Sequence, residues 1–232
     1  MNNAQEARRM LRAHRYGALS TLSLKFPGYP FGSITPYLVD HDGSLLILIS
    51  ELAEHTRNIQ QDPSVCLITH DQRDPDIQTQ GRVSALGDAA LAHDQAQAAE
   101  RYLRYFPDSR VYFELPGFFF FRIRPIAIRY IGGFGRIHWV TMENYFISHA
   151  AAFAKREPIL LEELNSQHQD GLRQLLLRQG IEADKPLVVG LDCDGLDVRS
   201  SGQLWRLDFA EPIDEPSQFI AAFTQLQHSV PT

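Results

Sequence analysis

The chain has 232 residues, of which 22 are Lys or Arg and 28 are Asp or Glu, so its formal net charge is −6. Hydrophobic residues make up 44% of the sequence, which excludes intrinsic disorder, and no apolar run reaches the roughly 18 residues of a membrane span. The acidic balance argues against a general nucleic-acid-binding protein, and the polar N-terminus predicts a cytoplasmic protein without a signal peptide.

The N-terminal part of the sequence predicts a short helix followed by a series of strands. Asn3 and Glu6 have the spacing of a capping box, so a helix is expected to begin there and to end near His14. Alternating apolar residues and turn signals then predict five strands, over residues 16–24, 31–39, 44–50, 64–69 and 79–89. A helix is expected over residues 52–61 and a polar loop over residues 71–76.

The next part of the sequence predicts an amphipathic helix and two more strands. The helix covers residues 93–106, with Ala96, Ala99, Leu103 and Phe106 expected on its buried face. The strands cover residues 118–131 and 134–140, and the longer one contains Pro125, which must lie at a sheet edge or a bulge. Because most connections are too short for a crossover helix, the sequence predicts a mainly β fold, an antiparallel closed or split barrel with short helices.

The last third of the chain differs in charge and in pattern. Residues 1–145 carry 15 basic and 15 acidic side chains, whereas residues 146–232 carry 7 and 13, so the whole net charge lies in the second part. Helices are predicted over residues 147–154, 159–165 and 169–179, a three-stranded meander over residues 186–209, and a final helix after Pro216. We therefore expect a barrel domain over residues 1–145 and a small acidic α+β domain over residues 156–232, with a boundary near Lys155–Pro158.

Several kinds of catalytic site are excluded by the residue pattern. Two cysteines and nine histidines without a His-x-x-x-His spacing do not make a zinc site. No Gly-x-Ser-x-Gly elbow is present, and Gly132-Gly133-Phe134-Gly135 lies between two strands rather than before a helix, unlike a dinucleotide site. The Asp192-x-Asp194-Gly195 sequence is interpreted as a hairpin turn. The sequence therefore identifies no metal site and no catalytic residue.

One segment has the composition of a phosphate-binding site. Residues 50–58 join a strand to a helix, where backbone N–H groups are free to bind an anion. Ser50, His55, Thr56 and Arg57 could all donate hydrogen bonds there. The alternative is that Ser50 caps the helix while His55 and Arg57 are solvated. Arg82 is a further candidate, and its alternative is a solvated strand face.

These segments resemble a known family. Five stretches in the first 145 residues carry the resemblance: Tyr16–Thr21, Ser50–Asn58, Asp62–Val65, Gln80–Val83 and Ile131–Arg136. They resemble the FMN-binding split-barrel family related to pyridoxamine 5′-phosphate oxidase, in particular the branch of HugZ- and HutZ-like haem-utilisation proteins. The remainder, through Asp192–Asp197 and Leu204–Leu207, is similar to the small α+β domain often attached to these barrels.

The resemblance implies a set of cofactor-binding residues. It implies that Ser50, His55, Thr56 and Arg57 hold the FMN phosphate. Backbone groups around Ser33 and Thr35 would flank the isoalloxazine ring, and Arg82 would lie near the flavin or a haem propionate.

The resemblance also implies an assembly. Such barrels form homodimers that bind the ligand in the groove between subunits. The stretch Phe118–Phe121 would suit that interface or else fill the barrel.

The sequence also departs from the family pattern. The Arg- and His-bearing ending that grips the substrate phosphate in pyridoxamine phosphate oxidases is replaced here by the acidic domain, which argues against pyridoxamine oxidation. The haem-degrading relatives have an axial histidine in a C-terminal segment, for which His138 and His168 are the candidates.

Three functions are therefore compared. The first is an FMN-dependent oxidoreductase acting on a small molecule, in which the flavin carries the electrons and no catalytic side chain is needed. The second is a haem-binding protein for haem degradation or utilisation, with a histidine on the iron and arginines on the propionates. The third is a non-enzymatic dimeric regulatory module whose acidic domain binds a protein partner. The first is preferred on the sequence alone.

Overall fold

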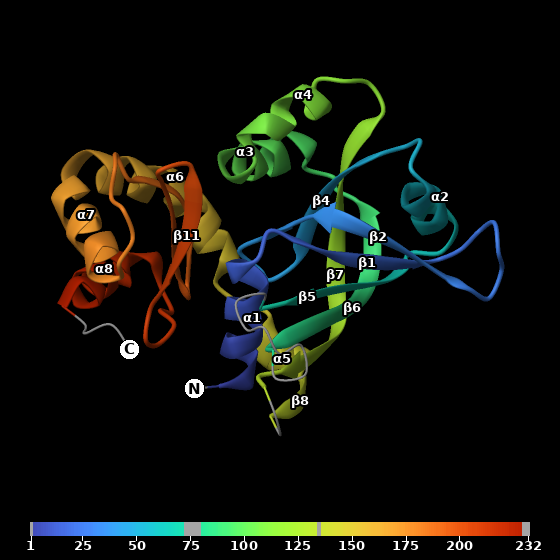
Figure 1. Ribbon diagram of the computed structural model, residues 1–232, viewed down its shortest axis with the longest axis horizontal. Helices are drawn as coiled ribbons and strands as arrows, with labels where there is room; N and C mark the ends of the chain where they lie inside the picture. Colours follow the sequence, from blue (N-terminus) through green and yellow to red (C-terminus); the bar gives the residue numbers. More distant parts are fainter. Residues whose placement is uncertain (1, 72–79, 134–135, 229–232) are drawn as a thin grey trace. The chain divides into compact units, whose positions relative to one another are not determined.

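The chain folds into two compact units, Met1–Ile147 and Ser148–Thr232 (Figure 1). The computed structural model describes residues 2–71, 80–133 and 136–228. The predicted polar loop over residues 71–76, and the beginnings of the strands predicted from residues 79 and 134, lie wholly or partly outside those ranges. Among the described residues, no helix is long and apolar enough to cross a membrane.

The first unit is built on an eight-stranded sheet in which every pairing is antiparallel, as predicted. The strand order is β2-β1-β5-β6-β7-β4-β3, and β8 pairs with β7. Its strands are β1 Tyr16–Leu22, β2 Pro30–Pro36, β3 Leu38–Val39, β4 Leu45–Ser50, β5 Ser64–His70, β6 Arg82–Leu91, β7 Phe118–Ile131 and β8 Ile137–Val140. The sheet curls, but β2 and β3 at its two ends do not pair with each other, so the barrel is split and β2 has an open edge.

Helices cover parts of this sheet. They are α1 Asn3–Ala13, α2 Glu54–Gln61, α3 Gln95–Tyr105, α4 Arg110–Phe113 and α5 Met142–Tyr145. Two details differ from prediction. The cap of α1 is Asn2, whose Oδ1 accepts a hydrogen bond from the Ala4 N–H at 2.9 Å. Helix α3 buries Ala98, Tyr102 and Tyr105 instead of Ala96 and Leu103, because large aromatic rings outweigh small aliphatic side chains in packing.

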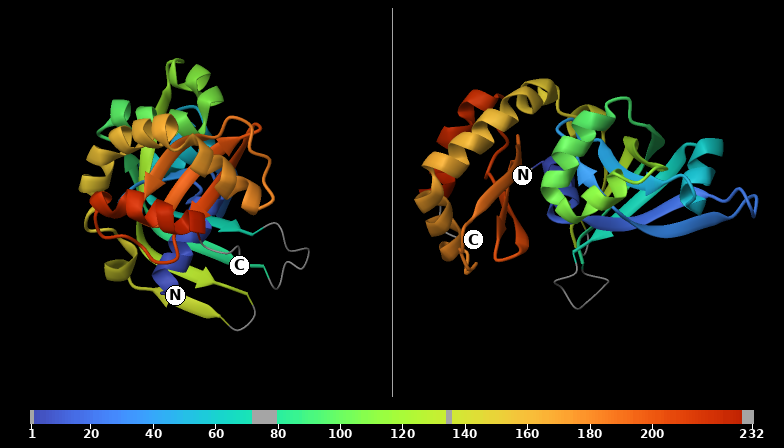
Figure 2. Two further views of the ribbon diagram at one scale, coloured as in Figure 1. Left: turned by 90° about the vertical axis from the view of Figure 1, so that its left-hand side faces the viewer. Right: turned by 90° about the horizontal axis from the view of Figure 1, so that it is seen from above.

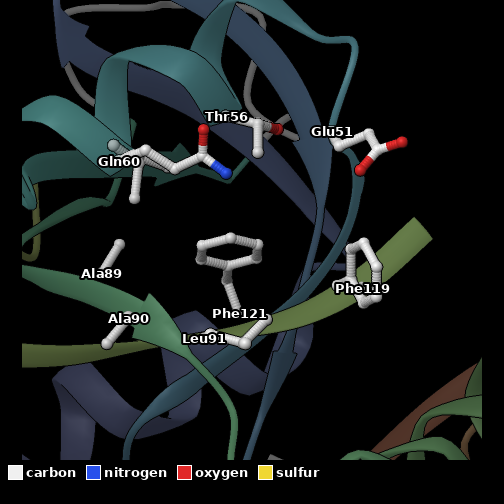
Figure 3. A pocket seen from close by; sticks show the side chains of 9 residues that line it. Glu51, Thr56, Gln60, Ala89, Ala90, Leu91, Phe119 and Phe121 are labelled. Atoms are coloured by element: carbon white, nitrogen blue, oxygen red, sulfur yellow. The ribbon is translucent and has the colours of Figure 1, made fainter. Parts of the chain in front are cut away.

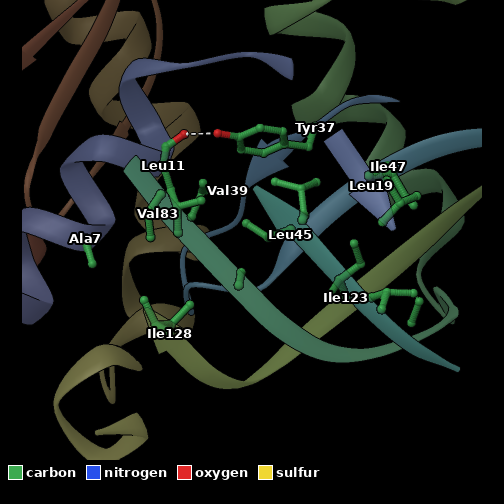
Figure 4. Packing of buried hydrophobic residues seen from close by; sticks show 14 of the residues in the cluster. Ala7, Leu11, Leu19, Tyr37, Val39, Leu45, Ile47, Val83, Ile123 and Ile128 are labelled. Atoms are coloured by element: carbon green, nitrogen blue, oxygen red, sulfur yellow. Dashed lines mark hydrogen bonds between the residues drawn. The ribbon is translucent and has the colours of Figure 1, made fainter. Parts of the chain in front are cut away.

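The core of the first unit lies on the concave face of the curled sheet (Figure 4). Alternate residues of each strand point into it, as in Leu19 and Leu67, which are fully buried on neighbouring strands. Tyr37, between β2 and β3, is also fully buried, and its hydroxyl donates to the Leu11 carbonyl at 2.8 Å. Burial raises the pKa of Tyr37 well above its ordinary value. This bond satisfies a carbonyl in the last turn of α1 and fixes the helix against the barrel.

Pro125 lies at a bulge, as predicted. The β6–β7 register shifts between Leu86, which pairs with Ala127, and Gly87, which pairs with Pro125. On its other side, β7 pairs with β4 from Phe118 as far as Ile123, and with β8 from Ile128 onward. Pro125 lies between these two paired stretches. No neighbouring strand therefore needs an N–H donor from Pro125.

The aromatic stretch Phe118–Phe121 contributes rings to both faces of the sheet. Phe120 and Phe121 are buried, and the Phe120 ring meets Tyr102 of α3 edge-on at 5.1 Å. Phe119, at 40%, is the most exposed of the four phenylalanines. Of the two roles considered for this stretch, barrel filling describes Phe121, whereas Phe120 is buried on the opposite face of the sheet, beneath α3 and α4.

The second unit packs helices against a three-stranded sheet of order β11-β10-β9 (Figure 2). Its elements are α6 Ala150–Gln167, α7 Gln169–Arg178, β9 Leu187–Asp192, β10 Gly195–Ser200, β11 Gln203–Asp208 and α8 Phe219–His228. Helix α6 is continuous through Pro158, where a boundary between two helices was expected. The division between the units instead precedes this helix. Pro158 faces solvent, and burial of Phe153, Leu160 and Leu164 holds the helix together across it.

A buried ion-pair network lies in the second unit. Arg206 binds both carboxylate oxygens of Asp192, at 2.8 and 2.9 Å, and also contacts Asp197 at 3.1 Å and Asp208 at 2.8 Å. The side chains of Arg206, Asp192 and Asp197 are at most 5% exposed. Asp192 therefore balances a buried cation. The β9–β10 turn is formed by Cys193 and Asp194, one residue before the Asp194-Gly195 turn that the sequence predicted, and Gly195 begins β10.

Candidate functional site

The predicted phosphate-binding segment forms a tight turn between β4 and α2. The Thr56 hydroxyl donates to the Ser50 carbonyl at 2.6 Å, and the Leu52 N–H donates to the Ser50 hydroxyl at 3.2 Å. Both hydroxyls thus take part in hydrogen bonds within the turn, but neither caps α2, whose N-cap is Ala53. Arg57 is exposed and has no partner among the described residues.

The charges around this turn do not favour an anion strongly. His55 is half-buried, and desolvation lowers the pKa of its imidazole, which favours the neutral form. Glu51 precedes the helix and Glu54 lies in its first turn. The segment therefore places one cation, Arg57, beside the two carboxylates of Glu51 and Glu54, which would repel a phosphate.

A cavity of about 300 Å³ lies beside α2, between the helix and strands β6 and β7 (Figure 3). Its walls are mainly apolar, from Ile59, Ala89, Leu91, Phe119 and Phe121. Glu51, Thr56 and Gln60 supply the polar atoms at its rim. With a carboxylate and no cation, this cavity does not fit a phosphate.

Ser33 and Thr35 lie on β2, the strand with the open edge. Their side chains point into the barrel, and both hydroxyls are buried without a partner among the described residues. Their backbone groups pair with Leu19 and Gly17 of β1, so the groups that face the open edge belong to Gly32 and Ile34. Because α2 packs near β2, this edge and the 50–57 turn lie on the same side of the barrel.

Arg82 lies far from that turn. Asn58 of α2 donates to Thr21 at 2.9 Å, and Thr21 aligns through Val65 with Gly87 on β6. Arg82 is five residues from Gly87 along the strand, about 17 Å at the usual rise. A single chain therefore does not bring Arg82 together with Ser50, His55, Thr56 and Arg57.

Arg82 belongs instead to the convex side of the sheet, which we call the outer face. It is formed by the strand residues that alternate with the core residues. One row of aligned neighbours crosses six strands: Ile34, Ala18, Ile68, Ser84, Arg129 and Trp139. The adjacent row contains His70, Arg82, Ile131 and Ile137. Large apolar side chains are exposed here, with Ile34 at 69%, Trp139 at 59% and Ile137 at 50%.

Two arginines stand on this apolar surface. Arg82 has no partner among the described residues, and the Arg129 guanidinium lies over the Trp139 ring, 5.0 Å from its centroid. Arg129 is diagonal to Arg82 across β6 and β7, a relation that places side chains about 7–8 Å apart. An exposed apolar surface with a pair of cations suits a largely apolar ligand that carries carboxylates.

The sequence interpretation identified Arg82 but missed His70, Arg129 and Trp139. Their common signal is an outward position on aligned strands, which becomes visible only when the pairing register is known. The two histidines that it proposed lie elsewhere. His138 is on the inward side of β8, paired with Tyr130, and His168 belongs to the second unit, edge-on to Phe223 at 5.6 Å.

Comparisons with known proteins agree with this fold. A curated relative, the chloroplastic haem oxygenase HOZ of Arabidopsis thaliana, is 30% identical over 210 residues, which are 88% of this chain. The chain spans 64% of that relative's length.

Two solved structures resemble nearly the whole chain. A protein of unknown function from Agrobacterium tumefaciens has a TM-score of 0.79 and 25% identity, covering 97% of this chain and 94% of the other. A haem-binding protein from Mycobacterium smegmatis has a TM-score of 0.59 and 27% identity, covering 98% and 97%. Residues 1–147 match the family model for the CREG β-barrel. The chain is therefore a member of the CREG β-barrel family, with the split-barrel fold that its sequence predicted.

Proposed function

We propose that this protein binds haem on the outer face of its barrel and acts in haem utilisation. The observation that carries the proposal is the outer face itself, an exposed apolar surface on which Arg82 and Arg129 stand side by side. Two similar proteins support it by name, a haem oxygenase and a haem-binding protein. Haem thus takes precedence over the FMN-dependent oxidoreductase favoured on the sequence alone.

The residues present fit the chemical groups of haem. Ile68 and Ile131, on the strands on either side of Arg82, offer apolar contact to a macrocycle. The guanidinium groups of Arg82 and Arg129 can each pair with a propionate through charge-assisted hydrogen bonds. Bound haem would supply iron-centred redox chemistry, and the chain would supply binding, orientation and exclusion of water.

A second copy of the chain is the proposed cover for the remaining apolar surface. Ile137 and Trp139, neighbouring outward residues of β8, are each at least half-exposed, and exposed apolar patches usually mark interaction sites. A homodimer through the outer face would shield the macrocycle from water, and sedimentation equilibrium would measure its formation.

FMN is the second candidate cofactor, because Arg57 in the 50–57 turn is exposed and none of the described residues pairs with it. The regulatory module, in which the acidic unit binds a protein partner, is the third proposal. It would gain support only from a protein that binds neither cofactor.

Titration of the purified full chain with haemin and, separately, with FMN tests these alternatives. We expect a Soret band that saturates at micromolar haemin. Arg82→Ala should weaken haemin binding about 10-fold or more through loss of a charge-assisted pair, whereas Arg57→Ala, a matched removal of one arginine, should leave it unchanged. Saturable FMN binding that Arg57→Ala weakens, with no Soret band, would refute the haem proposal.

A further inference from the structure

We propose that His70 supplies the axial nitrogen to the haem iron. This assignment rests on the proposed haem site and adds to it the residue that would fix the iron. It replaces His138 and His168, which the resemblance had suggested.

The position of His70 fits the role. It ends β5 on the outer face, directly opposite Arg82 on β6, where side chains of an antiparallel pair stand about 5 Å apart. Ile68 lies two residues earlier on the same face, and Ile131 lies beyond Arg82 in the same row. A side-chain nitrogen, a cation and apolar contacts therefore occur within two neighbouring rows.

A hydrogen bond prepares the imidazole for metal binding. Its Nδ1 lies 2.8 Å from the Gln80 Oε1 atom. An amide oxygen can only accept, so Nδ1 carries the proton and the lone pair is on Nε2. No described residue bonds to Nε2. Iron-ligating histidines commonly donate their second N–H to an oxygen acceptor in this way, which fixes the tautomer and raises ligand basicity.

The other histidines of the outer-face strands do not compete. His138, on β8, faces the same side as Val140, which belongs to the core. Among the strands that form the outer face, β1, β2 and β5 to β8, His70 is thus the one described histidine that points outward. His55 lies on α2, near the opposite end of β5.

Spectroscopy of the haemin-loaded full chain tests the assignment. In wild-type protein we expect the absorption and electron paramagnetic resonance signatures of a histidine-ligated iron. His70→Gly should lose them, and added imidazole should restore them by occupying the vacated position. His138→Ala is the matched control and should keep the wild-type spectrum. His70→Gln, which retains a polar side chain on the strand, should also lose the signature, and serves if the glycine variant does not fold.

Gln80→Leu gives a second readout. It removes the acceptor for Nδ1 while leaving His70 in place, and should weaken haemin binding about 10- to 100-fold, the usual effect of losing an outer-shell partner. An unchanged spectrum in folded His70→Gly, or loss of the signature in His138→Ala, would overturn the assignment while leaving haem binding intact. Absence of any Soret band from wild-type protein would instead reject the haem site itself.

Discussion

The ion-pair network around Arg206 should determine the stability of the second unit. In Arg206→Met, the carboxylates of Asp192 and Asp197, at most 3% exposed, would lose their counter-ion in the protein interior. Removing one partner of a buried pair typically costs about 3–5 kcal/mol, because the remaining charge is left uncompensated. Asp208 is 31% exposed and should contribute little to that loss.

Urea unfolding followed by circular dichroism would measure the effect, with Arg173→Met as the control. Arg173 is exposed on α7, so its replacement removes the same charge and should change the free energy of unfolding by less than about 0.5 kcal/mol.

A second substitution tests the cause. Asp192→Asn should destabilise the wild type but stabilise the Arg206→Met variant, because it then removes an unpaired charge. Two results would contradict this explanation: Arg206→Met unfolding at the same urea concentration as wild type, or Asp192→Asn lowering stability equally in both backgrounds. In either case, charge compensation by Arg206 does not stabilise the second unit.

Three further outcomes are expected in the first unit. Tyr37→Phe should lower the free energy of unfolding by about 1–3 kcal/mol, because the Leu11 carbonyl loses its donor; an unchanged urea midpoint would contradict this. Asn58→Ala should lower the free energy of unfolding by about 2–3 kcal/mol, because it removes a fully buried amide that accepts from the Leu24 N–H and donates to the Thr21 hydroxyl. Limited proteolysis should then cut the β1–β2 loop faster. Burial opposes ionisation of Asp40, but nearby arginines including Arg122 outweigh it and lower its pKa, so its stabilising effect is present above about pH 4 and is lost as pH falls further; Asp40→Asn should flatten that acid dependence in a pH series of thermal melts.

The barrel was predictable because its signals are local. The apolar run Phe118–Ile131 predicts a strand. Pro125 has no N–H to donate, which predicts a sheet edge or a bulge at its position. The break expected near Pro158 was wrong for the complementary reason, because the burial of Phe153 and Leu160 comes from tertiary packing that no local residue preference reports.

The candidate site was harder to predict. Arg82 could be recognised beside Gly81, but its neighbours Arg129 and Trp139 come from strands that place them 47 and 57 residues further along the chain. A shift of one residue in the pairing register would move each of them to the core side of the sheet. Conversely, Thr56 looks like a free donor in the sequence, and only the folded turn shows that its hydroxyl already donates to the Ser50 carbonyl.

The residues along the open edge of β2 protect this barrel from self-assembly into fibres. The residues of β2 whose nitrogen atoms face that edge are Pro30, Gly32, Ile34 and Pro36, since the alternate residues bond to β1. Proline has no N–H, so only the middle two positions can donate to an incoming strand. Prolines at both ends therefore leave too short a template for continuous strand addition, a protection that edge strands commonly require. The split in the barrel can stay accessible without turning the monomer into a seed for aggregation.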